Sequence, residues 1–98
     1  MRMLLVITDA EAIPAFERGF LENGSRGFTV APRVFGSGRS GLRAGTRAHP
    51  GASSLLFTVV PDAEEAETLR FLRGLRDAAG AAERTKIFSL AAEDVSQG

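Results

Sequence analysis

The chain has 98 residues, of which 44% are hydrophobic and 24% charged, and its twelve basic and twelve acidic side chains cancel. This length and composition fit a single globular domain spanning residues 1–98. Cysteine is absent, which excludes disulfides, thiolate metal sites and cysteine nucleophiles. The apolar runs at 3–7 and 55–60 are too short to cross a bilayer. Acidic residues follow the first run without a signal-peptide cleavage pattern, so we expect a cytoplasmic protein.

The charges are distributed unevenly along the chain. All twelve acidic residues lie outside the segment 24–60, and a general preference for arginine over lysine does not explain their absence there. The segment contains five arginines and the only histidine: Arg26, Arg33, Arg39, Arg43, Arg47 and His49. A locally positive surface favours an anionic partner, such as a phosphate, a carboxylate, a nucleic acid or an acidic protein.

In chain order, the first predicted elements are a strand, a helix and a second strand. Residues 2–8 are aliphatic and β-branched, which is typical of a central strand buried on both faces. Asp9 can then cap a helix that Asn23-Gly24 ends. The helix has an apolar face of four residues, Ile13, Phe16, Phe20 and Leu21. Residues 28–35 form the second predicted strand, in which Pro32 indicates an edge position or a bulge.

The segment 36–53 contains five glycines and Pro50 and has no hydrophobic period, so we predict a long mobile loop. Loops of this length in compact domains are usually functional or disordered. Residues 54–60 form the third predicted strand. A second helix begins at Pro61-Asp62, where Asp62 and Glu65 have capping-box spacing, and ends at Gly80.

The buried stripe of this second helix is expected to consist of Ala66, Leu69, Leu72 and Leu75. Residues 85–91 form a fourth strand, and 93–98 a short tail. The order β-α-β-β-α-β predicts an α+β, ferredoxin-like fold, in which two helices pack on one face of a four-stranded antiparallel sheet. The other face carries apolar residues on more than one strand, which indicates an oligomer that covers it.

Most classes of functional site find little support in the residue pattern. Catalysis normally needs a base beside a nucleophile or a metal, and the Glu64-Glu65 pair is explained better by its place at a helix start. His49 alone makes a poor metal site unless a three-fold oligomer gathers three copies. Phe57 and Phe88 could stack RNA bases on the sheet, but the RNA-recognition octapeptide is absent. We therefore expect neither an enzyme nor a nucleic-acid-binding protein.

A phosphate site is the better-supported prediction. The sequence Gly36-Ser37-Gly38-Arg39 leaves a strand and enters the glycine-rich segment. Glycines allow backbone N–H groups to approach an anion, and Arg39 can bind it through two N–H groups at once. A plain flexible turn has the same glycine pattern, so this motif leaves both readings open.

Two stretches of the chain resemble the PII signal-transduction proteins. Gly27-Phe28-Thr29-Val30 followed by Gly36-Ser37-Gly38-Arg39 is similar to the family's Gly-x-Thr-Val strand, which runs into Gly-x-Gly-Arg at the base of a long T-loop. Lys86-Ile87-Phe88 and the later Glu93-Asp94-Val95 are similar to its Lys-Ile-Phe and Glu-Asp-Ala/Val patterns. In element order and spacing the resemblance covers nearly the whole chain.

The resemblance implies a homotrimer that binds adenine nucleotides in clefts between subunits and signals to a membrane transporter or a metabolic enzyme. It places Thr29 near the adenine, Gly38 and Arg39 at the phosphates, and Lys86, the only lysine, as a second phosphate contact. Other residues expected at this nucleotide or anion site are Gly27, Gly36, Ser37 and Arg84. The loop read by the partner would carry Arg43, Arg47 and His49.

Several departures from the family pattern change what the resemblance implies. The segment 78–84 keeps one of the glycines that usually wrap the phosphates and adds Glu83. Ser40 replaces the glutamine that helps to hold 2-oxoglutarate, the T-loop is shortened, and the chain has no tyrosine to uridylylate. The chain also ends soon after Val95, without the family's C-terminal arginines. We therefore expect a divergent PII-like protein that has no tightly bound cofactor and binds ADP, AMP, ATP, a cyclic nucleotide or bicarbonate weakly.

Two other assemblies fit the same order of elements. A trimer resembling the CutA-type proteins would respond to metal through His49 or be purely structural, without a nucleotide site. A metabolite sensor resembling the ACT domains would more often be a dimer.

Overall fold

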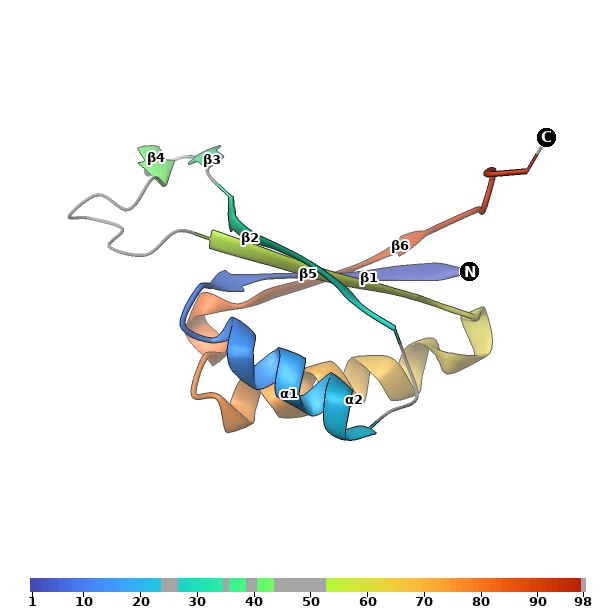
Figure 1. The fold of residues 1–98 in the computed structure, drawn as a ribbon, viewed down its shortest axis with the longest axis horizontal. Coiled ribbons are helices and arrows are strands. Elements are labelled where there is room, and N and C mark those ends of the chain that lie inside the picture. Colours follow the sequence, from blue (N-terminus) through green and yellow to red (C-terminus); the bar gives the residue numbers. More distant parts are fainter. Residues whose placement is uncertain (24–26, 35, 39–40, 44–52, 98) are drawn as a thin grey trace.

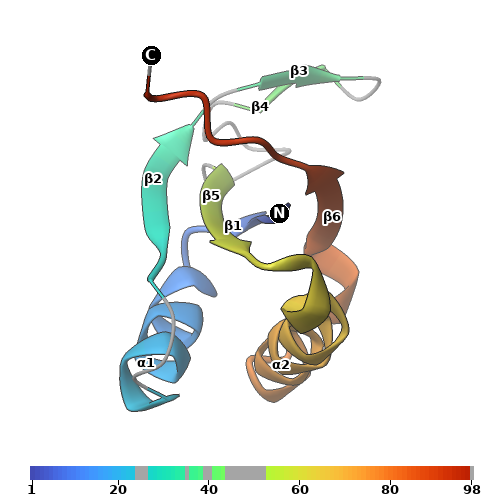
Figure 2. The ribbon, with the colours of Figure 1, turned by 90° about the vertical axis from the view of Figure 1, so that its right-hand side faces the viewer.

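The structure is a computed structural model, and it describes residues 1–23, 27–34, 36–38, 41–43 and 53–97. Four strands form an antiparallel sheet in the order β2-β5-β1-β6. The bounds of these strands are Arg2–Asp9 (β1), Thr29–Val34 (β2), Ser53–Val60 (β5) and Lys86–Ala91 (β6). The helices α1 (Ile13–Asn23) and α2 (Glu65–Ala78) lie side by side on one face of this sheet (Figures 1 and 2). The predicted ferredoxin-like fold is confirmed.

The strand β1 lies between β5 and β6, as expected for a central strand. Its alternate residues Leu4 and Val6 are fully buried against the helices. The residues between them are only partly covered, because helices pack on one face of the sheet alone. The prediction that β1 is buried on both faces was therefore wrong for the single chain.

Both predictions from Pro32 are confirmed. The strand β2 is an outer strand of the sheet, and its pairing with β5 shifts register between Ala31 and Val34. Proline has no N–H for the ladder, so it is tolerated at such a position. Phe28, the expected first residue of the strand, precedes it and packs against the core.

Part of the expected loop 36–53 has structure of its own. The strands β3 (Gly36–Gly38) and β4 (Gly41–Arg43) form a second, antiparallel sheet in which Gly36 pairs with Arg43. The prediction of a structureless loop was wrong there, because backbone hydrogen bonds can form a hairpin without a hydrophobic period. The strand β5 also starts one residue early, at Ser53, which pairs with Asp9 and Val34. Residues 39–40 and 44–52 lie outside the described residues.

Aromatic residues of α1 form the centre of the core. Phe16 is fully buried, and the Phe20 ring lies 4.9 Å from that of Phe28 and 5.2 Å from that of Phe71. The expected fourth core position, Leu21, is 73% exposed. Gly19 takes its place on the inner face and lies against Leu75 of α2, because it is the position three residues after Phe16 that faces α2.

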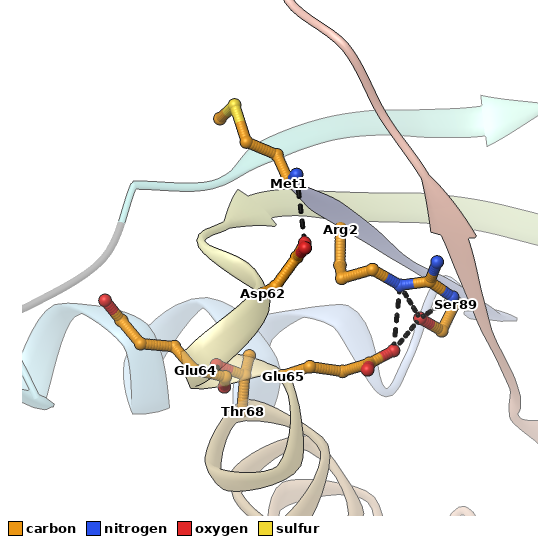
Figure 3. Close-up of polar contacts among 7 residues, drawn as sticks. All are labelled: Met1, Arg2, Asp62, Glu64, Glu65, Thr68 and Ser89. Carbon is orange, nitrogen blue, oxygen red and sulfur yellow. Dashed lines mark hydrogen bonds and ion pairs between the residues drawn. The ribbon is translucent and has the colours of Figure 1, made fainter.

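The second helical segment begins with a 3₁₀ turn, η1 (Asp62–Glu64), before α2. The predicted capping box does not form, since neither start carries a side-chain cap hydrogen bond. Asp62 instead pairs with the amino group of Met1 at 2.9 Å. Glu65 accepts hydrogen bonds from Ser89 and, at 3.0 Å, from Arg2 (Figure 3). Both acids therefore bind residues at the start of β1 and in β6 instead of capping the helix.

The buried stripe of α2 differs from the prediction at one position. Leu72 is fully buried, and Leu69 and Leu75 pack against the core. Ala66 is exposed, and Thr68 is buried in its place because its hydroxyl donates to the Glu64 carbonyl at 2.8 Å. The expected stop at Gly80 is confirmed by its φ of 64°, in the left-handed region that glycine tolerates best.

Candidate functional site

The face of the sheet opposite the helices is apolar and partly exposed. Within the described residues it consists of the alternate positions that point away from the core. In β5, β1 and β6 these are Leu55, Phe57, Val59, Met3, Leu5, Ile7, Phe88 and Leu90. We call this set the open face. Val59, Leu90 and Phe88 are 40%, 45% and 48% exposed, so the described part of the chain leaves them largely uncovered.

The predicted adenine-side residues lie at the start of β2, along one edge of the sheet. Thr29 is exposed and pairs in register with Phe57, which places it on the open face. The Gly27 carbonyl accepts a hydrogen bond from Thr58 at 2.6 Å. A Cβ added to Gly27 would meet nothing within 4 Å, so no described neighbour requires glycine at this position.

Lys86 lies at the start of β6, along the opposite edge. It is exposed and pairs with Ile7, which places it on the open face as well. Among the described residues it makes no hydrogen bond or ion pair, in contrast with Arg2, Arg76 and Arg84. Its ammonium group is therefore free, within this part of the chain, to bind an anion.

One chain does not bring the two groups of predicted site residues together. The strands β2 and β6 are the outer strands of the four-stranded sheet, with β5 and β1 between them. Three interstrand spacings separate them by about 14 Å. Thr29 and Lys86 can therefore contact the same small ligand only if the β2 edge of one chain meets the β6 edge of another.

Arg84 lies at the end of η2 (Ala82–Arg84), just before β6, and is already paired. Its Nε donates to Asp9 Oδ2, and its Nη1 donates to the Gly80 carbonyl at 3.3 Å. The hydrogen bond to Asp9 raises the pKa of Arg84 above its usual value. Asp9 also accepts a hydrogen bond from the Ala12 N–H at 2.9 Å, which confirms its predicted place at the helix start. The pairing of Asp9 with Arg84 was not predicted, because the two residues lie 75 positions apart in the chain.

The remaining predicted residues belong to the glycine-rich segment. The backbone of Gly36, Ser37 and Gly38 forms β3, and that of Arg43 ends β4. Arg39, Arg47 and His49 lie outside the described residues. The small sheet continues from the end of β2, at the same end of the molecule as the start of β6 (Figure 1).

A second polar cluster lies at the other end of β1 and was not foreseen from the sequence. Arg2 donates to Glu65 and to Ser89, and Ser89 donates to Glu65 (Figure 3). The hydrogen bond from Ser89 is the main cause that lowers the pKa of Glu65, with further contributions from Arg2. The three groups bind one another, so this cluster joins β1, β6 and α2.

Other kinds of site have little support in the described ranges. Among these residues, no group of three or more histidine and acidic side chains is arranged to hold a metal ion. Within the same ranges, no helix is long and apolar enough to cross a membrane.

Comparison with solved structures identifies the architecture. One structure of CPII, a nitrogen regulatory PII-like protein from Thiomonas intermedia K12 bound to ADP, AMP and bicarbonate, superposes with a TM-score of 0.56. The chain has a PII-like fold. That match has 15% sequence identity and covers 91% of this chain and 84% of CPII.

Two further CPII structures agree with this assignment. One, also bound to ADP, AMP and bicarbonate, has a TM-score of 0.56 at 14% identity and covers 94% of this chain and 93% of CPII. The other, bound to ADP and bicarbonate, has a TM-score of 0.55 at 18% identity and covers 91% and 84%. No family model matches the sequence, and no curated protein does. The PII-like fold therefore rests on structure, and the function must be argued from the residues.

Proposed function

We propose that the chain is a non-enzymatic, PII-like regulatory protein that forms a homotrimer and binds an adenine nucleotide or a small anion between subunits. One observation carries this proposal. Thr29 and Lys86 both lie on the open face, but on opposite outer strands of the sheet. A site that uses both needs two chains, with the β2 edge of one against the β6 edge of the next.

The open face supplies a reason for the chains to associate. Val59, Phe88 and Leu90 leave between 40% and 48% of their surface exposed, and burying apolar surface stabilises an assembly by about 25 cal/mol per Å². A ring of three chains brings three such faces to one axis, and it repeats the same β2-to-β6 contact three times. The predicted trimer is therefore consistent with an apolar centre and three peripheral sites.

The ligand class follows from the groups around the proposed cleft. Lys86 and the outer N–H groups of Arg84 suit a phosphate or a carboxylate-like anion. Gly27 leaves room beside the backbone for a flat base near Thr29. CPII, which shares the fold, is bound to ADP, AMP and bicarbonate. Arg39 directly follows Gly38 in the sequence, and we propose it, with Gly36, Ser37 and Gly38, as the remaining phosphate contacts.

Regulation is assigned to the segment 36–53. We propose that the bound ligand favours one conformation of this segment, and that a transporter or metabolic enzyme in the cytoplasm recognises Arg43, Arg47 and His49 in that conformation. A ligand shifts such an equilibrium only by its difference in affinity for the two states.

Isothermal titration calorimetry with ADP, AMP, ATP, cyclic AMP and bicarbonate tests the proposed site. The Lys86→Gln variant should bind the preferred ligand about tenfold or more weakly, because one charge-assisted hydrogen bond is lost. Arg73→Gln is the matched control, since it removes one charge from an exposed position of α2. The proposal fails if no ligand binds below the millimolar range, or if both variants lose the same affinity.

A further inference from the structure

Asp9 holds the guanidinium of Arg84 in a fixed position at the end of β1. One carboxylate oxygen of Asp9 accepts from Arg84 Nε, and the other accepts from the Ala12 N–H at 2.9 Å. The Gly80 carbonyl accepts from Arg84 Nη1 at 3.3 Å. The arginine is thus held by the last residue of β1 on one side and by the turn that follows α2 on the other.

The same contacts leave part of Arg84 available. A guanidinium has five N–H groups, and two of them are used by Asp9 and Gly80. The Arg84 side chain is 52% exposed, whereas that of Asp9 is 23% exposed. The outer N–H groups of Arg84 can therefore meet an anion from solvent while its Nε stays on Asp9.

Acidic groups dominate the surroundings of this arginine. Besides Asp9, the carboxylates of Glu11 and Glu83 act electrostatically on Arg84. Asp9, Glu11 and Glu83 carry three negative charges, against two positive charges on Arg84 and Lys86. This end of the sheet is therefore slightly negative over these five groups, although the neighbouring segment 24–60 contains no acid.

We propose that Asp9 is a specificity-determining residue, which positions Arg84 and whose own charge biases the anion site toward ligands of low negative charge. This inference rests on the proposed anion site at Arg84 and Lys86. An anion on the outer edge of Arg84 lies about 7 Å from the Asp9 carboxylate, across one guanidinium and two hydrogen bonds. In water-like surroundings the repulsion at that distance weakens binding about threefold for each unit of ligand charge.

The test compares wild type with Asp9→Asn by calorimetry at low ionic strength. The ligands, in order of increasing charge and without magnesium, are cyclic AMP, AMP, ADP and ATP. Asparagine removes the charge and keeps one of the two acceptor oxygens, so it can still accept from either the Ala12 N–H or Arg84 Nε. The lost hydrogen bond affects every ligand equally, whereas the lost charge acts in proportion to the charge of the ligand. The ratio of variant to wild-type affinity should rise with ligand charge, by about threefold from cyclic AMP to AMP and by less for each further phosphate of ADP and ATP, whose added charges lie farther from Asp9. The gain should shrink as salt is added.

Two further variants keep the test decisive. Asp62→Asn is the matched control, because it makes the same chemical change at the opposite end of β1, about 23 Å away, and its affinities should equal those of wild type. Glu83→Gln removes a neighbouring charge without touching the Asp9 hydrogen bonds, and it should give a smaller gain of the same kind. It replaces Asp9→Asn if thermal unfolding shows that variant to be misfolded.

The outcomes separate this inference from the proposed function. An equal change for every ligand, or no change, would mean that Asp9 acts only as a structural partner of Arg84, and the inference would be wrong. If Lys86→Gln still weakens nucleotide binding in that case, the proposed function stands. If neither wild type nor any variant binds a nucleotide or bicarbonate, both are wrong.

Discussion

Replacing Phe88 by glutamate should break the proposed assembly. Phe88 is 48% exposed on the open face, and a phenylalanine side chain buries about 200 Å² when fully covered. Covering the exposed half removes about 100 Å² from water, which contributes about 2.5 kcal/mol per subunit at 25 cal/mol per Å². That corresponds to about a 70-fold weaker association per subunit before the cost of burying a carboxylate is added.

Sedimentation velocity across a concentration series measures this effect. Wild type should sediment as a trimer, and Phe88→Glu should shift to the monomer in the same range. Leu21→Glu is the matched control, because Leu21 is 73% exposed but lies on α1, on the helix side of the sheet. The reasoning is refuted if wild type is monomeric throughout, if Phe88→Glu stays trimeric, or if Leu21→Glu dissociates equally.

Three further predictions concern the fold that carries the site. Gly19→Ala should lower the melting temperature in wild type, because the new Cβ would lie 2.3 Å from Leu75 Cδ2. In a Leu75→Ala background the same change should raise it, because alanine favours the helix by about 1 kcal/mol over glycine. Equal shifts in both backgrounds would contradict this packing. Glu65→Gln should destabilise the protein at pH 7 in urea unfolding. The folded-state pKa of Glu65 is lowered, so its contribution is present above the unfolded value of about 4.3 and is lost as pH falls through the lower folded value. The two proteins should therefore converge in acid, and a difference that persists there would contradict the assignment. Gly80→Ala should cost about 1 kcal/mol in the same assay, since φ is 64° at this residue; an unchanged unfolding midpoint would contradict it.

The sequence determines most of the secondary structure because the signals are local. Pro32 indicated an outer strand or a bulge, and the structure has both. Gly80 indicated a helix end, and its positive φ confirms it. The errors at Leu21 and Ala66 have one cause, which is the rotation of each helix about its own axis relative to the elements it packs against. An apolar period shows that a helix has a buried face, but packing decides whether a glycine or a threonine belongs to it.

The contacts around the candidate site could not be predicted in the same way. The Asp9–Arg84 pair spans 75 residues, and it follows only when β1 and β6 are placed side by side with Ile7 opposite Lys86. The capping box failed for a related reason, because long-range partners on β1 and β6 compete for Asp62 and Glu65. The separation of Thr29 from Lys86 likewise depends on strand order, which the sequence pattern of single elements does not specify.

Subunit complementation is the most direct test of the central claim. That claim is a ligand site shared between the β2 edge of one chain and the β6 edge of the next. Thr29→Glu and Lys86→Gln should each abolish or strongly weaken nucleotide binding when every subunit carries the change. In trimers co-expressed from equal amounts of the two variants, about a quarter of the interfaces join an unchanged β2 edge to an unchanged β6 edge. Calorimetry on these mixed trimers should then recover about a quarter of the wild-type sites, with wild-type affinity. Mixed trimers that recover no sites would contradict the shared site.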